Sequence, residues 1–222
     1  MRYAAILCAA ALVFLFAATA SATIFLYEDF EGSAPGWTTT GQINGQSGSL
    51  WHLEDHRSHG GKGSAAYNTD GTPPCYSYDV GTSWGIAMSP WIDLSTASNV
   101  YLHFWSWLET ENAPLEYDIA FCMLKVGGAP WFPLAPDIQV FQQGEWNHLT
   151  ADLSALAGLP AVKVGFAFDS VDQYSNNYEG WYVDDVLLTD GETPPVPEPS
   201  TLILLGTGLL GAGAVLRKRV RG

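Results

Sequence analysis

One short pattern has the spacing of a nucleophilic serine. Residues 81–85 read Gly-Thr-Ser-Trp-Gly and satisfy G-x-S-x-G. That spacing serves catalysis where a strand, a sharp turn and a helix expose the serine above an α/β sheet. No helical pattern follows Gly85. We therefore expect no catalysis by Ser83.

A second group of candidate ligands is the run HLEDH at residues 52–56, with His59 beyond it. A zinc protease motif needs two histidines four apart on a helix, with glutamate directly after the first. Here Glu54 stands one place late, and Gly60-Gly61 without an apolar period argues against a helix. The pattern favours loop hydrogen bonding or incidental metal affinity.

The third group consists of carboxylates that resemble the paired acids of jelly-roll glycosidases. Glu116 and Asp118 begin an alternating run of acids, but Phe121 stands where the next acid would be needed. Glu109 and Glu111 flank a turn that contains proline. These acids are better interpreted as a solvated rim than as catalytic residues.

The elements that must position such residues are β-strands. No stretch of the core shows an extended helical period, although residues 153–159 could form one turn before Pro160. About nine or ten strands at regular spacing predict an all-β, antiparallel two-sheet sandwich. Residues 32–48 read as a loop. The expected strands are 23–30, 50–53, 64–67, 85–94, 100–108, 118–126, a short one around 131–132, 146–153, 162–169 and 180–188.

Two strands show how the core is filled. Residues 100–108 are apolar or aromatic on both faces, which predicts a central strand. Residues 162–169 alternate cleanly, with Val162, Val164, Phe166 and Phe168 on one face, as in a half-buried strand. All nine tryptophans lie in the expected domain. We expect most of them to fill the space between the sheets, and one or two to serve as sugar-stacking platforms.

Four carboxylates could meet at one edge of such a sandwich, because its first and last strands commonly lie side by side. They are Asp29, Glu31, Asp184 and Asp185. Val183 and Val186 sit three apart, so a bulge at Asp184-Asp185 is needed for both to face the core. Oxygen ligands in an acidic domain suit a structural Ca²⁺ ion. The alternative is that one aspartate caps a turn and the others are solvated.

The N-terminus has the pattern of a secretion signal. Arg2 precedes an apolar stretch, and Ala20-Ser21-Ala22 has the A-x-A form that signal peptidase recognises. We predict a signal peptide at residues 1–22, cleaved between Ala22 and Thr23. The positive charges at both ends place the segment between them outside the cytoplasm.

The exported segment is strongly acidic. It keeps four basic residues against 22 acidic ones, a formal charge of −18. Such a surface repels phosphate backbones, which excludes nucleic acid as an expected partner, and it favours divalent cations. Cys75 and Cys122 are its two cysteines. In an oxidising compartment they could form one disulfide, or they could remain two buried thiols.

The C-terminus has three parts in a fixed order. A Pro-rich linker at residues 191–199 ends in Pro197-Glu198-Pro199, an apolar helix is expected at 201–216, and the basic tail 217–222 holds Arg217, Lys218 and Arg219. Sixteen helical residues span roughly 24 Å, short for a permanent anchor across about 30 Å of hydrocarbon.

This order resembles the PEP-CTERM sorting signal at residues 196–222, which exosortase recognises. The resemblance implies an exported protein that is anchored in the inner membrane before processing and then reaches the cell surface or extracellular matrix. The alternative is an ordinary C-terminal membrane anchor.

The domain at residues 23–190 resembles a bacterial MAM-like jelly-roll module, similar to those appended to secreted metalloproteases of the immune-inhibitor type. The segments that carry the resemblance are 51–69, 88–95, 102–111, 117–128, 146–154 and 176–188, above all GWYVDDV. It implies a non-catalytic module, not an enzyme, that binds exopolysaccharide or another matrix component. The alternative is a carbohydrate-active hydrolase on the same scaffold.

Overall fold

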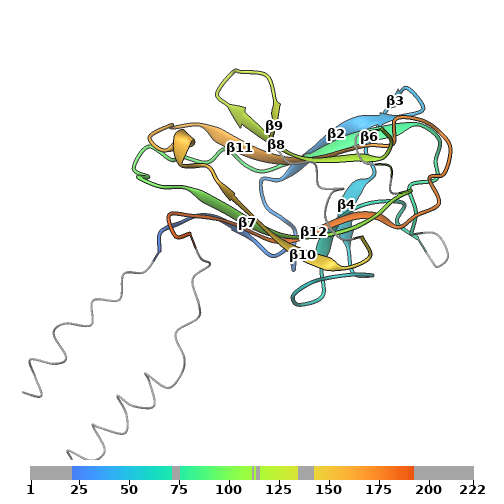
Figure 1. Cartoon of the computed structure of the whole chain (residues 1–222), viewed down its shortest axis with the longest axis horizontal. Helices are drawn as coiled ribbons and strands as arrows, with labels where there is room; N and C mark the ends of the chain where they lie inside the picture. The colour runs from blue at the N-terminus through green and yellow to red at the C-terminus, as the bar shows by residue number, and fades with distance from the viewer. Residues whose placement is uncertain (1–21, 72–75, 112, 114–115, 135–142, 193–222) are drawn as a thin grey trace, which may run out of the picture. The chain divides into compact units, whose positions relative to one another are not determined.

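A computed structural model describes residues 22–71, 76–111, 113, 116–134 and 143–192. These residues form twelve strands and one short 3-10 helix, arranged as two stacked sheets (Figure 1). The strands are β1 (Ile24–Glu28), β2 (Thr38–Ile43), β3 (Gln46–Ser47), β4 (Trp51–Glu54), β5 (Ser64–Tyr67), β6 (Ser83–Met88), β7 (Tyr101–Glu109), β8 (Ile119–Val126), β9 (Phe132–Leu134), β10 (Trp146–Asp152), β11 (Val162–Asp169) and β12 (Gly180–Thr189), and the helix η2 is Ser154–Leu156. The predicted all-β sandwich is confirmed.

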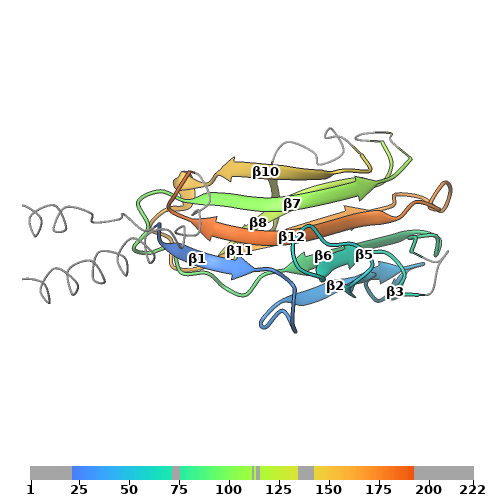
Figure 2. The same ribbon diagram turned by 90° about the horizontal axis from the view of Figure 1, so that it is seen from below.

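Each sheet has six strands, and every pairing is antiparallel. Sheet A has the order β10-β7-β12-β5-β4, with β1 also paired to β12. Sheet B has the order β3-β2-β6-β11-β8-β9. Figure 2 shows β1 beside β12. The first and last strands are therefore neighbours, as the sequence predicted.

The core lies between the inward faces of the two sheets. Val162, Val164, Phe166 and Phe168 of β11 are all buried, which confirms the alternation read from the sequence. Strand β7 lies between β10 and β12, and both of its faces are largely buried. It is an interior strand, as predicted.

The prediction of a loop at residues 32–48 is wrong, because β2 and β3 form a hairpin there. The two residues between the strands, Asn44 and Gly45, have φ angles of 50° and 76°. Positive φ at both central positions is typical of a type I′ turn, for which Asn-Gly is the preferred sequence. Strand β2 has few large apolar side chains, and it is held by backbone pairing with β6 along Thr38–Ile43.

The tryptophans are distributed differently from the prediction. Trp51 and Trp181 belong to the core between the sheets and contact each other edge to face at 5.4 Å. Trp107 is buried in a separate cluster with Ala66 and Tyr182. Trp84 and Trp91 are 39% and 52% exposed. Packing between the sheets thus accounts for only some of these rings.

Several predicted features lie outside the described residues. They include most of the signal peptide, Cys75, the Pro197-Glu198-Pro199 motif, the apolar stretch 201–216 and the basic tail. Within the described part of the chain, no helix is long and apolar enough to cross a membrane. Cys122 is buried, and burial raises the pKa of its thiol to about 12. Its pairing with Cys75 stays a prediction.

Candidate functional site

The first candidate site is built on an irregularity in β12. The pairing of β12 with β7 shifts register between Asp184 and Leu187, and Asp185 has a φ of 50°. Val183 and Val186 on either side are both fully buried in the core. The bulge expected at Asp184-Asp185 is therefore confirmed. It lets two valines three residues apart face the same core.

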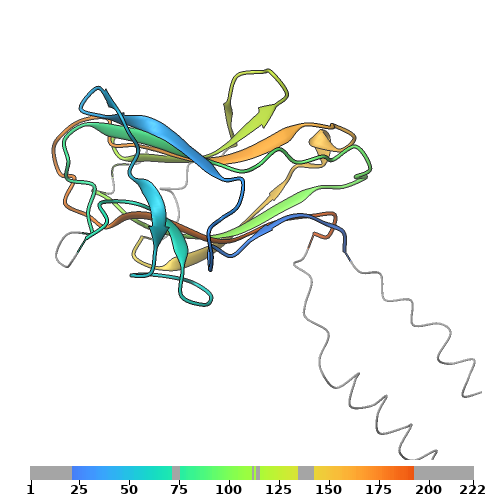
Figure 3. The same cartoon turned by 180° about the vertical axis from the view of Figure 1, so that it is seen from behind.

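Asp184 binds the loop between β4 and β5 through backbone amides. Its carboxylate is fully buried and accepts hydrogen bonds from the N–H groups of His59 at 2.8 Å, Gly60 at 3.1 Å and Asp185 at 2.7 Å. Burial, with a further contribution from the charge of Asp185, raises the pKa of Asp184 to about 6. Asp184 thus anchors the loop, which we call the 55–63 loop and which folds beneath sheet A in Figure 3.

Two more of the predicted carboxylates hold the same loop. Asp185 Oδ2 lies 2.8 Å from His59 Nδ1, and the His59 ring stacks on Trp105 at 3.6 Å between centroids. Glu31 Oε1 accepts the N–H groups of Lys62 and Gly63. These bonds lower the pKa of the Glu31 carboxyl. Three of the four carboxylates therefore converge on one loop.

Asp29 lies near this group. Its Oδ1 accepts the N–H of Glu31 at 3.2 Å. Burial, followed by the charges of Asp29 and the two β12 aspartates, raises the pKa of Tyr27. The charges of three of the predicted calcium ligands thus contribute to the raised pKa of Tyr27.

The closest set of metal-ligating side chains among the described residues is a different one. His52, Glu54 and Asp70 offer ligand atoms that all lie within 4.8 Å of one another and could hold a metal ion. Incidental metal affinity was one interpretation of the run 52–56, but that run was judged against helical spacing and Asp70 was not anticipated as a member of the set. On β4, side chains two residues apart point to the same face.

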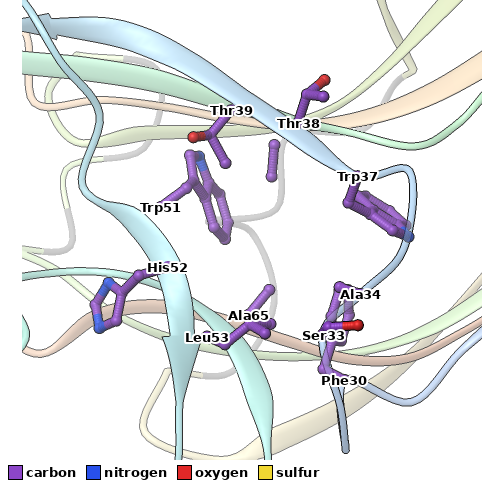
Figure 4. Close-up of a pocket in the computed structure, with 11 residues that line it drawn as sticks. Phe30, Ser33, Ala34, Trp37, Thr38, Thr39, Trp51, His52, Leu53 and Ala65 are labelled. Atoms are coloured by element: carbon purple, nitrogen blue, oxygen red, sulfur yellow. The ribbon is translucent and has the colours of Figure 1, made fainter.

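A small pocket of about 190 Å³ opens where β4 of sheet A faces β2 of sheet B. Figure 4 shows Trp51 and Trp37 on opposite sides of it, with Thr39 above and Ala34 below. A second hollow of about 380 Å³ shares Phe30 and Leu53 with this pocket. It is lined by four carboxylates and one amine: Glu31, Glu54, Asp55, Asp70 and Lys62.

The outward side of sheet B carries a partly exposed aromatic surface. Because Ala87 faces the core, the alternating Trp84, Ile86 and Met88 of β6 face outward. Trp131, in the β8–β9 connection, packs over Gly165, where a Cβ would lie 3.0 Å from its ring. Figure 1 shows the β8–β9 hairpin rising above this sheet.

The exposed Trp91 lies beside Lys163, whose Nζ is 5.1 Å from the ring centroid. We call the outward side chains Trp84, Met88, Trp91 and Trp131, together with Ile86, which is buried at 7% exposure, the Trp84 face.

The residues considered for catalysis are poorly placed for it. Ser83 is 1% exposed and lies on β6 without a following helix. Asp118 is fully buried and accepts the Tyr78 hydroxyl at 2.7 Å, whereas Glu116 is exposed. Because Asp118 is buried and bonded to Tyr78, it is not positioned to act on a substrate together with Glu116.

Comparisons with known proteins agree with the two parts of the chain. Residues 195–219 match the PEP-CTERM protein-sorting motif. The domain is 27% identical over 163 residues to Bacillopeptidase F of Bacillus subtilis (strain 168), covering 73% of this chain. The chain spans about a tenth of the length of that curated relative.

Solved structures share the sandwich. TmCBM61, solved in complex with β-1,4-galactotriose, is 13% identical, with a TM-score of 0.51 over 75% of this chain and 97% of its own. The K3 cleaved adhesin domain of Lys-gingipain from Porphyromonas gingivalis W83 is 18% identical, with a TM-score of 0.46 over 75% and 99%. The first likeness shows the fold.

The sorting motif marks a secreted protein that is anchored in the membrane before exosortase processes it. The chain therefore carries the PEP-CTERM protein-sorting motif of an exported protein after an all-β sandwich that shares its fold with TmCBM61.

Proposed function

We propose that the sandwich is a non-catalytic module that binds an extended polysaccharide on the Trp84 face. The observation that carries this proposal is the pair of exposed indole rings on one side of sheet B. Trp84 pairs with Asp169 and Trp91 lies against Lys163, six residues earlier on β11, which places the two rings about 20 Å apart along that strand. A linear glycan can contact both rings, whereas a single sugar can contact only one.

The surroundings of these rings suit sugar recognition. Aromatic faces bind the apolar C–H faces of sugars, and nearby polar groups fix the orientation through hydroxyl groups. Trp84 lies directly between Gln42 and Asp169 in the sheet register. Lys163 and Lys125 are cross-strand neighbours at the other end. Each end of the face thus combines a stacking ring with groups able to donate or accept hydrogen bonds.

Two further observations support binding without catalysis. Ser83 and Asp118 are buried, so neither the serine pattern nor the acid pair has an open route to substrate. TmCBM61, which shares the fold, was solved with a galactose oligomer bound. After processing, we propose that the protein resides at the cell surface or in the extracellular matrix, held by exopolysaccharide.

A structural Ca²⁺ ion near Asp29, Glu31, Asp184 and Asp185 forms the second part of the proposal. The support is that Glu31, Asp184 and Asp185 bind one loop, that Asp29 accepts the N–H of Glu31, and that Asp184 is buried beside the like charge of Asp185. A cation would relieve that repulsion. Melting the protein with Ca²⁺ and then with EDTA tests this part. A higher melting temperature with Ca²⁺ supports it, and identical curves contradict it.

Affinity electrophoresis in gels that contain soluble polysaccharides tests glycan binding. The wild-type chain should be retarded by at least one polysaccharide, and Trp84→Ala or Trp91→Ala should migrate as in a gel without glycan. Tyr174→Ala is the matched control, because Tyr174 is 68% exposed but lies on a loop outside the Trp84 face. Equal retardation of all variants would refute the proposed face.

A further inference from the structure

A second binding site is suggested by two side chains on edge strand β4. His52 and Glu54 are two residues apart, so they point to the same face of the strand. His52 Nε2 lies 3.2 Å from Glu54 Oε2. Asp70 follows β5 and completes a set whose ligand atoms all lie within 4.8 Å of one another. The pairing of β4 with β5 brings this third ligand to the first two.

The protonation of His52 is constrained by the backbone. Its Nδ1 lies 2.8 Å from the carbonyl oxygen of Leu50, which can only accept a hydrogen bond, so Nδ1 must carry the proton. In the neutral ring, the lone pair of Nε2 then points at a carboxylate oxygen. Two acceptors at 3.2 Å repel each other unless a proton or a metal ion lies between them.

Glu54 is also fixed for this role. Its side chain is 6% exposed, and its Oε1 accepts the N–H groups of Asp55 and His56. With Oε1 occupied by these backbone bonds, Oε2 is the oxygen that faces His52 Nε2.

The hollow beside His52 and Glu54 has an excess of negatively charged side chains. Glu54 and Asp70 line it together with Glu31 and Asp55, and Lys62 is the one basic residue among the residues that line it. A divalent cation would compensate the excess negative charge. The hollow would also leave room for water to complete the coordination of an ion.

We propose that His52 Nε2, Glu54 and Asp70 bind a divalent first-row transition ion such as Zn²⁺. An imidazole ligand favours such ions, whereas Ca²⁺ and Mg²⁺ prefer oxygen ligands alone. Two ligands about 2.0–2.1 Å from a tetrahedral ion lie about 3.3 Å apart, close to the 3.2 Å observed between His52 and Glu54. The Leu50 carbonyl then accepts the hydrogen bond from Nδ1–H that orients a metal-bound histidine.

Calorimetric titration of the full chain, purified in a mild detergent, with ZnCl₂ tests this site. We expect one equivalent of zinc and at least about 10-fold weaker binding in Asp70→Asn, because losing a direct ligand should cost no less than the roughly 10- to 100-fold typical of losing a partner that only orients one. Asp55→Asn is the control, because it removes the same charge from the same hollow without removing a ligand. It should bind zinc nearly as the wild type does.

X-ray absorption of the zinc-loaded protein gives an independent readout. The spectrum should contain one imidazole nitrogen among oxygen ligands, and His52→Gln should abolish that nitrogen signal. An absence of zinc uptake, equal weakening in Asp55→Asn and Asp70→Asn, or displacement of zinc by an equal concentration of CaCl₂ would each overturn the proposal. Because no glycan is present, failure here leaves polysaccharide binding on the Trp84 face a separate question.

Discussion

Replacing Asp184 should release the 55–63 loop and destabilise the domain. The carboxylate accepts three backbone N–H groups, from His59, Gly60 and Asp185. Hydrogen bonds to charged groups are worth about 1.5–3 kcal/mol each, and buried donors left unpaired cost about 1–3 kcal/mol. Water will reach some of these donors once the loop opens. We therefore expect Asp184→Ala to lower the free energy of unfolding by about 3–5 kcal/mol, and Asp184→Asn by about half as much.

The assay is urea unfolding followed by tryptophan fluorescence, in EDTA and above pH 7 so that Asp184 is ionised and no metal contributes. Amide hydrogen exchange should show loss of protection at His59 and Gly60 in Asp184→Ala. Asp185→Asn is the control, because the Asp185 side chain contacts the partly exposed His59 ring rather than the backbone amides of the loop, and asparagine tolerates its positive φ. A loss below about 1 kcal/mol in Asp184→Ala, or unchanged exchange, would refute the anchoring role.

Three further predictions follow from the structure and the sequence. Burial raises the pKa of both Asp184 and Asp118 to about 6, above their values in the unfolded chain. The folded state therefore binds more protons, and the free energy of unfolding should fall as pH rises from about 4 to 6. In EDTA the melting temperature should be higher at pH 5 than at pH 7.5, and the reverse order would contradict these assignments. In a Cys75→Ser background, the buried Cys122 thiol, whose pKa burial raises to about 12, should resist iodoacetamide until urea is added, and rapid native labelling would contradict its burial. Replacing Pro197, Glu198 and Pro199 by alanine should leave an unprocessed, membrane-retained chain on an immunoblot, and normal maturation would contradict exosortase recognition.

The strands were predictable wherever side-chain periodicity was strong. The alternation in β11 and the spacing of Val183 and Val186 are local patterns, and they anticipated a half-buried strand and a bulge. Strand β2 was missed because its threonines and Gly41 carry little apolar signal, and only Asn44-Gly45 marked the turn. Backbone pairing with β6 holds β2 in place, and composition does not reveal that pairing.

The sites were less predictable because they depend on which strands are neighbours. His52 and Glu54 were visible as a pair, but Asp70 joins them only through the β4–β5 pairing. Trp84 lies within the G-x-S-x-G pattern, in which only Ser83 was considered as a functional residue. Alternation along β6 buries the serine and exposes the tryptophan, so the same pattern has a different meaning on a strand.

Fractionation of cells that express the wild-type chain or Trp84→Ala tests most directly whether export and glycan binding act in sequence. The sorting signal is intact in both proteins, so both should be processed to the same extent. The wild type should then remain with the cell surface and matrix, while Trp84→Ala should be released into the medium. If the variant is processed normally but stays with the cells as the wild type does, the Trp84 face is not what retains the protein.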